Sequence, residues 1–346
     1  MSEKNKNLPS AEPCFSKTRN KKILVTGGAG YIGSITVRVL KKEGFEPIIF
    51  DNLVTGHKES IAQEKFYQGD LVKDIVLLDK VFKEEKPEAV IHFAAMSLVG
   101  ESVVNPQKYF TNNLIGALNL LKVMLENKVL KIVFSSTAAV YGEPKKIPID
   151  EEDAKNPTSP YGESKLMIEK ILNGYGQAYG LNSTALRYFN ACGALLDGSL
   201  GEDHHPETHL IPAAMQAALA KKVFKLFGND YPTPDGTCIR DYIHVLDLAQ
   251  AHILALNAFQ KGFKFYNVGT NHGFSNLEVL EMIKKISGLD FAISIEARRS
   301  GDPVRLIAKA EKIKKELGWR AKYSDLETIV KSAWQWHKTH PQGFTK

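Results

Sequence analysis

The sequence predicts an α/β protein with a doubly wound parallel sheet and a smaller mixed α/β domain. Short runs rich in Val, Ile and Phe alternate with segments of helical periodicity from 21 to 190, as parallel strands joined by crossover helices require. A glycine-rich turn follows the first of these runs. After Asn190 the rhythm changes to a polar, histidine-rich loop, GEDHHPETH, and to the turn-rich GNDYPTPDG, which places the second domain at 191–346.

Five apolar runs are the candidate strands of the first domain: KKILVTG, FEPIIFD, AVIHFAA, KIVFSST and STALRYF. Four segments with helical periodicity lie between them, at 32–43, 74–85, 105–127 and 161–179, and each ends near glycine or a polar cluster. In the second domain, HLIPAAMQAALAK has the pattern of a helix. Some strand or helix segments of this domain could return to the first one, and we expect the two domains to meet at a cleft.

The composition excludes several classes of protein. The chain has 346 residues and a formal net charge of +6 with scattered basic residues, so we expect neither a nucleic-acid groove nor a membrane-binding face. The three cysteines, Cys14, Cys192 and Cys238, lack the paired spacing of zinc ligands or of a disulfide framework, so we expect no metal and a reducing, cytoplasmic setting. The polar leader at 1–20 lacks a signal-peptide pattern and is expected to be a disordered extension.

The glycine-rich turn carries Gly27, Gly30 and Gly33 between the first strand and an apolar-periodic helix. Glycines there permit a tight turn and bring the backbone and the helix amino terminus close to a pyrophosphate. Asp51 ends the next strand about twenty residues later, where a carboxylate accepts hydrogen bonds from ribose hydroxyls. Together they predict a Rossmann-like dinucleotide site that favours NAD over NADP. Asp70, after a third apolar run, is either a further contact at the adenine end or a turn residue.

Tyr161 and Lys165 form the candidate catalytic pair. Their spacing in YGESK places both side chains on one face of a helix, where the ammonium group stabilises a tyrosinate. With a positive nicotinamide ring beside it, the phenol pKa would move from about 10 towards neutrality and give a general base. The same spacing occurs in YGEPK at 141–145, but Pro144 forbids a regular helix there, whereas Pro160 suits a first helical turn.

Thr137 ends the KIVFSST strand, at the carboxyl edge where open parallel sheets bind ligands. Its hydroxyl would polarise the substrate oxygen and complete a proton relay with Tyr161 and Lys165. Each of Ser135, Ser136 and Thr137 alone is better explained as a strand-end residue that caps the backbone. The downstream tyrosine favours the relay.

These residues resemble the UDP-glucose 4-epimerase family of the extended short-chain dehydrogenase/reductase superfamily, over nearly everything from Lys21 onward. The matching strings are TGGAGYIGS, FDNL, GDL, VIHFAA, VGESV, NNLIGALNLL, FSSTAAVYG, SPYGESK, LRYFNACGA, FGNDYPTPDGTCIRDYIHV, YNVGT and RRSGDP. The resemblance implies a UDP-sugar substrate, transient oxidation at sugar carbon 4 by permanently bound NAD, and inversion there between UDP-glucose and UDP-galactose. It also implies a homodimer formed through the helices at 105–127 and 161–179.

The resemblance assigns site residues as well. It implies Tyr161 as the base, Lys165 as its activator and Thr137 as the hydroxyl that many relatives supply as serine. The implied cofactor contacts are Gly27, Gly30, Tyr31, Ile32, Gly33, Asp51, Asn52, Asp70, Leu71, Phe93, Ala94, Ala95, Asn112, Lys165 and Phe189. The implied substrate contacts are Thr137, Tyr161, Asn190, His209, Leu210, Arg240, Arg299, Asp302 and Leu306.

Three positions differ from patterns common in the family. Ser97 stands where some relatives place a lysine near the pyrophosphate, and His209 stands where some have an asparagine facing the nucleotide sugar. Leu306 stands where relatives restricted to glucose and galactose often carry tyrosine, so an acetamido group could be accommodated and N-acetylated UDP-hexosamines turned over.

Other functions stay open. Another UDP-sugar 4-epimerase, acting on a pentose or a uronate, is hard to separate by sequence. A nucleotide-sugar dehydratase is disfavoured because Ala138 and Ala139 follow Thr137, where dehydratases of the superfamily carry acidic residues. A non-catalytic NAD-sensing module is disfavoured because such proteins typically lack the tyrosine and lysine pair. For Arg240 and Arg299, surface solvation is the alternative to a grip on phosphate.

Overall fold

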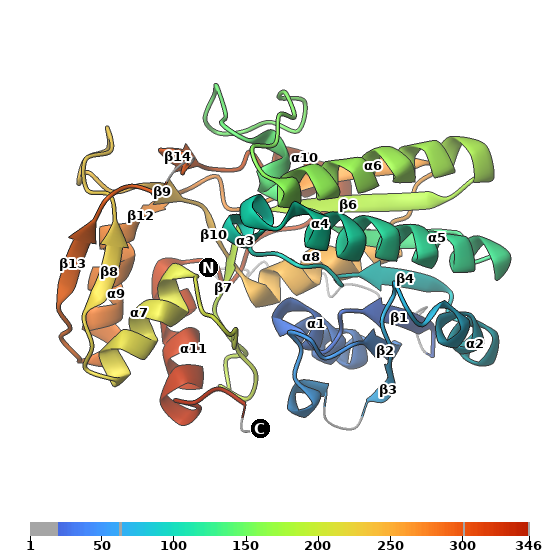
Figure 1. Ribbon diagram of the computed structural model, residues 1–346, viewed down its shortest axis with the longest axis horizontal. Coiled ribbons are helices and arrows are strands. Elements are labelled where there is room, and N and C mark those ends of the chain that lie inside the picture. The colour runs from blue at the N-terminus through green and yellow to red at the C-terminus, as the bar shows by residue number, and fades with distance from the viewer. Residues whose placement is uncertain (1–19, 62–63, 300–301, 345–346) are drawn as a thin grey trace, which may run out of the picture.

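A seven-stranded, wholly parallel sheet forms the larger part of the molecule (Figure 1). The computed structural model describes residues 20–61, 64–299 and 302–344, so the extension expected at 1–20 lies outside the described residues except for Asn20. The strands, in spatial order, are β3 (Lys65–Gln68), β2 (Glu46–Asp51), β1 (Lys22–Thr26), β4 (Ala89–His92), β5 (Lys131–Ser135), β6 (Asn182–Tyr188) and β11 (Phe263–Val268). The order reverses between β1 and β4, which is the switch point of a doubly wound sheet, and the predicted fold class is confirmed.

Helices cover both faces of this sheet because successive strand residues point to opposite sides. On β1, Ile23 and Val25 pack towards α1 (Tyr31–Lys42) and α8 (Val245–Asn257), whereas Leu24 packs towards the opposite layer. That opposite layer consists of α2 (Ile75–Glu85), α5 (Gly116–Glu126) and α6 (Pro160–Tyr179). The helices predicted at 32–43, 74–85 and 161–179 are therefore confirmed to within a residue at most ends.

The segment predicted as one helix at 105–127 is interrupted. It consists of α4 (Pro106–Tyr109), a π-helical turn at Phe110–Ile115 and α5, and it follows the short α3 (Val99–Val104). The turn carries the buried Asn113, whose side chain accepts a hydrogen bond from the Met96 backbone N–H and donates to the Met96 carbonyl. Periodicity missed the interruption because a π turn keeps the same residue types and is stabilised by a contact remote in sequence.

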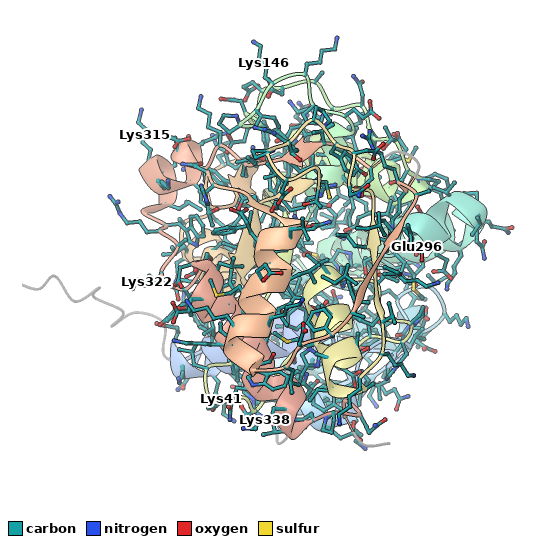
Figure 2. All side chains as sticks on the ribbon, turned by 90° about the vertical axis from the view of Figure 1, so that its left-hand side faces the viewer. Lys41, Lys146, Glu296, Lys315, Lys322 and Lys338 are labelled. Atoms are coloured by element: carbon teal, nitrogen blue, oxygen red, sulfur yellow. The ribbon has the colours of Figure 1, made fainter. Side chains whose placement is uncertain are left out.

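The later part of the chain forms a smaller region at the left of Figure 1, and this side of the molecule faces the viewer in Figure 2. Its helices are α7 (Leu210–Leu219), α9 (Asn276–Ser287) and α11 (Leu326–Thr339), which enclose their own apolar core. Its short ladders join β7 (Asn190–Cys192) to β10 (Tyr242–His244), β8 (Phe224–Phe227) to β13 (Ile293–Glu296), and β9 (Ile239–Arg240) to both β12 (Phe274–Ser275) and β14 (Arg305–Leu306). From the same part of the chain, β11, α8 and α10 (Glu311–Leu317) pack onto the large sheet. None of the described helices is long and apolar enough to cross a membrane.

Candidate functional site

An open cleft of about 590 Å³ lies at the carboxyl ends of β1, β2 and β4. It is lined by Gly27, Gly30, Phe50, Asp51, Asn52, Val54, Thr55, Gly69, Leu71, Phe93, Ala94, Ala95, Met96 and Asn112. Most of the residues predicted to contact the cofactor are therefore in this lining. Five lining residues were not predicted, although each lies within a few residues of a strand end, which is the signal that could have identified them: Phe50, Val54, Thr55, Gly69 and Met96.

Six predicted cofactor residues are outside that lining: Tyr31, Ile32, Gly33, Asp70, Lys165 and Phe189. The backbone of Tyr31 and Ile32 begins α1, and the Tyr31 hydroxyl is occupied, since it donates to the Gly193 carbonyl at 2.6 Å. Ser97, at the position where some relatives carry lysine, is exposed next to Met96.

The glycine turn forms a cradle that a larger residue would fill. Gly27 has φ +73°, and a Cβ atom there would lie 2.5 Å from the Ala94 backbone nitrogen. A Cβ atom on Gly33 would lie 2.1 Å from the Gly27 carbonyl oxygen. Gly30 is the N-cap of α1 and contributes no side-chain cap, so the first-turn N–H groups of the helix keep their capacity to bind an anion. This turn fits the pyrophosphate of a dinucleotide.

Asp51 occupies the end of β2 beside that turn. Its Oδ2 accepts the Ala29 N–H at 3.0 Å and its Oδ1 accepts the Leu53 N–H at 2.8 Å, which fixes the orientation of the carboxylate. Burial raises the pKa of Asp51, and these backbone hydrogen bonds oppose the rise. The carboxylate oxygens have further lone pairs that could accept from ribose hydroxyls.

Asp70 serves as a turn residue in this structure, which is the alternative that the sequence left open. It accepts backbone N–H groups from Val72 and Lys73, and it also accepts from the Asn52 side chain at 2.9 Å. Although burial favours the neutral acid, these hydrogen bonds hold the pKa of Asp70 below its usual value. Asp70 therefore orients Asn52, which does line the cleft.

Tyr161 and Lys165 lie in the first turns of α6. Ser159 caps the helix by accepting the Gly162 N–H, and Pro160 occupies the first turn as predicted. Both side chains are buried, and the Lys165 Nζ donates to the Ser135 carbonyl at 2.8 Å. The structure thus brings this pair to the carboxyl end of β5, one strand away from β4, whose carboxyl end borders the cleft.

Thr137 follows β5 and forms the backbone cap that was one of the two functions considered for it. It caps a 3-10 helix at Ala138–Tyr141 by accepting the Ala139 N–H at 3.1 Å, and its hydroxyl also acts to lower the pKa of the Tyr161 phenol. Ser135 and Ser136 are occupied elsewhere, with the Tyr188 hydroxyl and with Glu169 respectively.

Burial shifts the pKa values of the pair in opposite directions. It raises the pKa of Tyr161, and the hydrogen bond with Thr137 only partly offsets the rise. It lowers the pKa of Lys165 to about 7, against the opposing effect of Glu169. The side chains alone do not bring the phenol towards neutrality, so the lowering expected from the sequence depends on the positive charge of the cofactor.

Tyr141, the competing tyrosine, has a different environment. Its hydroxyl donates to Asn267 Oδ1 at 2.7 Å and accepts from Arg187 Nη1 at 2.9 Å. It sits in the 3-10 helix, and no regular helix continues through Pro144. Both hydrogen-bonding capacities of this phenol serve the core.

The predicted substrate residues are divided between buried and exposed positions. Arg240 is buried in β9 and forms an ion pair with Asp302, while Arg299 is exposed with its guanidinium 4.2 Å from the centre of the Phe227 ring. Leu306 pairs with Arg240 in the ladder between β14 and β9, and its side chain packs against a cluster that contains Phe189.

The three remaining substrate positions, Asn190, His209 and Leu210, lie at the two ends of the segment that runs from β7 to α7. The Asn190 side chain donates to the Asp241 carbonyl at 3.0 Å. His209 is the N-cap of α7, directly before Leu210, and its Nδ1 lies 2.7 Å from Glu202 Oε1.

Comparison with known proteins places this geometry among relatives. The family model described as "NAD dependent epimerase/dehydratase family" matches residues 23–269. The chain is 51% identical over 326 residues to the UDP-glucose 4-epimerase of Lacticaseibacillus casei, covering 93% of this chain and 98% of the relative.

Two solved structures extend the likeness to three dimensions. The UDP-glucose 4-epimerase from Bifidobacterium longum in complex with NAD⁺ and UDP is similar with a TM-score of 0.89 and 41% identity, covering 94% of this chain and 100% of that one. The UDP-Glc/GlcNAc 4-epimerase from Campylobacter jejuni is similar with a TM-score of 0.81 and 44% identity, covering 92% and 100%.

Proposed function

Because the chain belongs to the NAD dependent epimerase/dehydratase family, we propose that it interconverts UDP-glucose and UDP-galactose by inversion at sugar carbon 4. The observation that carries the proposal is the buried Tyr161 and Lys165 pair, set at the same edge of the sheet as the glycine cleft, in a chain half identical to curated UDP-glucose 4-epimerases. Residues 21–190 bind the dinucleotide and 191–346 bind the nucleotide sugar in this proposal.

NAD is the cofactor, and it supplies a reversible acceptor for the hydride of carbon 4. The turn from Gly27 to Gly33 holds its pyrophosphate, and Asp51 holds the adenosine ribose. The buried, carbonyl-bonded ammonium of Lys165 adds positive charge next to the phenol.

Tyr161 removes the proton from the sugar 4-hydroxyl and later returns it, while Thr137 donates a hydrogen bond that stabilises the charged oxygen. Lys165 favours the tyrosinate electrostatically. The 4-keto sugar turns over between the two hydride transfers, so the nucleotide must stay anchored while the sugar rotates. Arg240, oriented by Asp302, and Arg299 supply guanidinium groups for that anchoring.

A coupled assay tests the proposal. Purified protein with its bound NAD is given UDP-galactose, and the UDP-glucose formed is measured with a UDP-glucose dehydrogenase. Tyr161→Phe should retain NAD and lose about 10²- to 10⁴-fold in kcat, because the base is removed and the binding groups remain. Turnover of a UDP-pentose or a UDP-uronate in preference to UDP-galactose would assign the chain to a different 4-epimerase, and release of a 4-keto-6-deoxy sugar would identify a dehydratase.

Substrate breadth is the finer part of the proposal. Leu306 is partly buried against the Phe189 cluster and has neither the length nor the hydroxyl of tyrosine, so the sugar side of the site keeps room for an acetamido group. We expect turnover of UDP-N-acetylglucosamine at lower efficiency than UDP-glucose, with Leu306→Tyr reducing the former selectively. No turnover of the acetylated sugar at enzyme concentrations that equilibrate UDP-glucose within minutes would refute this expectation.

The proposal includes a homodimer in the cytoplasm. Apolar side chains are exposed along the segment from α3 to α5, where Val103 is 60%, Val104 81% and Ile115 43% exposed. Exposed apolar side chains of this kind fit pairing with a second copy. Light scattering at micromolar concentration should give twice the chain mass, and Ile115→Glu should shift it towards the monomer.

A further inference from the structure

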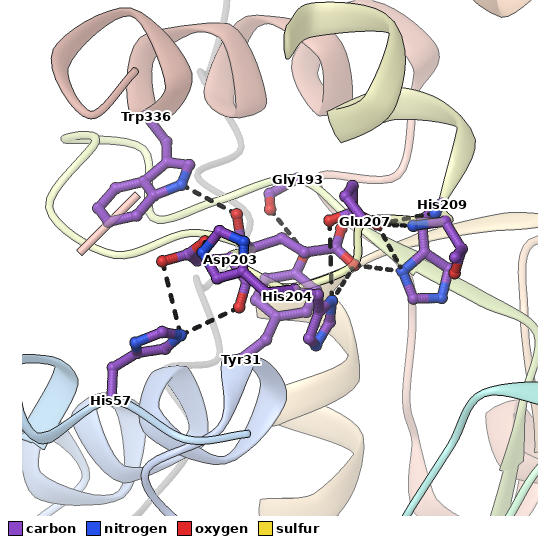
Figure 3. A network of polar contacts seen from close by, with 11 residues as sticks. Tyr31, His57, Gly193, Asp203, His204, Glu207, His209 and Trp336 are labelled. Atoms are coloured by element: carbon purple, nitrogen blue, oxygen red, sulfur yellow. Dashed lines mark hydrogen bonds and ion pairs between the residues drawn. The ribbon is translucent and has the colours of Figure 1, made fainter. Parts of the chain in front are cut away.

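Four side chains converge in the loop between β7 and α7, outside the cleft. Each of these side chains offers one atom that could bind a metal ion, an imidazole nitrogen or a carboxylate oxygen, and the four atoms all lie within 4.8 Å of one another (Figure 3). The residues are Glu202, His204, Glu207 and His209. Both histidines present Nδ1. The His209 Nδ1 is 2.7 Å from Glu202 Oε1 and 3.4 Å from Glu207 Oε1, and the His204 Nδ1 is 3.2 Å from Glu202 Oε1 and 3.8 Å from Glu207 Oε2.

Two of these atoms are buried without a hydrogen-bond partner. Within the described ranges, only five buried side-chain nitrogen or oxygen atoms lack a partner, and His204 Nδ1 and Glu207 Oε2 are two of them. The Glu207 side chain is only 5% exposed. Its Oε1 accepts the backbone N–H groups of Thr208 and His209, each at 2.7 Å, so the orientation that points Oε2 into the cluster is fixed by the chain itself. Unpartnered buried lone pairs that face one another are costly unless something binds them.

We propose that these four residues bind a divalent transition-metal ion, with Zn²⁺ as the best match. Four ligands about 2.1 Å from a tetrahedral ion are about 3.4 Å from one another, and the contacts between these side chains fall around that value. Two imidazoles favour zinc or a neighbouring transition metal over Mg²⁺ and Ca²⁺, which take oxygen ligands. Four protein ligands leave no open position, so the site is structural.

The alternative to a metal ion is protonation of both histidines. Two imidazolium ions between two carboxylates would give the same net charge as neutral imidazoles around a divalent cation. Protonated imidazoles, however, need N–H groups that point at acceptors, and the His204 Nδ1 makes no hydrogen bond even though Glu202 Oε1 lies 3.2 Å away. The neighbouring His205 lies outside this cluster, since its Nε2 is 3.2 Å from Asp203 Oδ1 and its side chain is exposed.

The ion would organise the loop that leads into the proposed sugar side. His209 is the N-cap of α7, and the Tyr31 ring from the start of α1 packs edge-on to His204. A metal bond to His209 Nδ1 leaves its Nε2–H free as a donor and fixes the ring. The site thus links α1, the loop and α7. This consequence for the sugar side rests on the proposed function, whereas metal binding does not.

The experiment measures the metal that the tag-free holoenzyme retains. The protein is expressed in zinc-supplemented medium and then passed through gel filtration in metal-free buffer. Mass spectrometry should find about one zinc per chain, chelation should lower Tm, and added Zn²⁺ should restore it. Glu207→Gln and His204→Ala should each lower the retained zinc at least about 10-fold and make Tm insensitive to the chelator. His205→Ala is the matched control and should retain the ion.

Bound NAD, read from absorbance, reports that each variant is folded. Wild-type protein that holds no transition metal, and whose Tm does not respond to Zn²⁺, would overturn the proposal and leave the proton-bridged cluster. Equal zinc in wild type, Glu207→Gln and His204→Ala would overturn it too, since the ion would then lie elsewhere. Neither outcome depends on epimerase activity, so failure of the metal site and failure of the proposed function are distinguishable.

Discussion

Lys165 and Arg187 are both buried cations, 3% and 2% exposed, yet their surroundings are opposite. Arg187, on β6, forms a two-point ion pair with Glu169, at 2.9 Å from Nε to Oε1 and 2.5 Å from Nη2 to Oε2. Lys165 is one turn before Glu169 on α6, but it donates to the Ser135 carbonyl and faces the Phe134 ring at 4.8 Å. No ion pair involving Lys165 occurs among the described residues.

The two surroundings have opposite effects on the pKa values of Arg187 and Lys165. Glu169 raises the pKa of Arg187 despite its burial, so this cation stays charged at every relevant pH. Burial lowers the pKa of Lys165 to about 7, so this ammonium group can lose its proton near neutral pH. A buried cation whose neighbouring carboxylate pairs with another residue is costly for folding, which makes Lys165 a candidate for a chemical role.

The largest expected effect comes from removing the unpaired charge. Lys165→Met should lower kcat by about 10²- to 10³-fold, since the tyrosinate loses its electrostatic support. Lys170→Met, on the exposed side of the same helix, is the control and should leave kcat unchanged. The coupled assay measures kcat for both variants. Near-wild-type turnover in Lys165→Met would contradict a chemical role for the unpaired lysine.

Removing the partner of the paired charge should act on stability. Glu169→Gln leaves the Arg187 guanidinium buried with a neutral amide, and we expect the free energy of unfolding to fall by about 3 kcal/mol. Denaturant unfolding at pH 7 measures the change. A loss of activity at unchanged stability would show instead that Glu169 acts on the catalytic pair.

The pH dependence of stability should carry the signature of Lys165. Its pKa is about 7 in the folded chain against a usual value of 10.5, so between these values the unfolded chain binds more protons and stability rises with pH. Between about pH 7 and about pH 9, the free energy of unfolding of the wild type should rise by about 2 kcal/mol relative to that of Lys165→Met. At about pH 7 the methionine variant should be the more stable of the two. Parallel stability curves for the two proteins would mean that Lys165 is not desolvated.

The smallest expected effect is at Tyr141. Tyr141→Phe removes the acceptor of Arg187 Nη1 and the donor to Asn267, and should cost about 1 to 2 kcal/mol of stability while kcat stays within a few fold. Thermal unfolding measures the loss of stability, and the coupled assay measures kcat. Inactivation of a folded variant would transfer the catalytic assignment to this tyrosine.

The parts of the site that lie on one element could be predicted from the sequence. The Gly27 to Gly33 turn, the position of Asp51 at a strand end, and the helix that carries Tyr161 and Lys165 all follow from spacing within a single strand or helix. The cluster around His204 was not predicted, because no cysteine takes part in it and its local signal is the H-x-x-E-x-H spacing in this loop.

Contacts between elements escaped prediction for a physical reason. The pairing of Glu169 with Arg187 and that of Asn113 with Met96 depend on how α6, β6 and the π turn pack, which no local pattern encodes. The sequence therefore located the residues of the proposed site but not the residues that hold them in place. The sequence allowed for segments of the second domain that return to the first, but it did not identify β11 as the strand that pairs with β6.

That position of β11 affects how the chain folds during synthesis. The first six strands of the sheet are complete once Tyr188 has left the ribosome, but the strand that covers the outer edge of β6 begins only at Phe263. At about 5 to 20 residues per second, the intervening stretch of about 75 residues keeps that edge uncovered for about 4 to 15 s. An unpaired apolar edge strand is a template for association with other chains. The nascent protein therefore passes through an interval in which chaperones have a defined surface to protect.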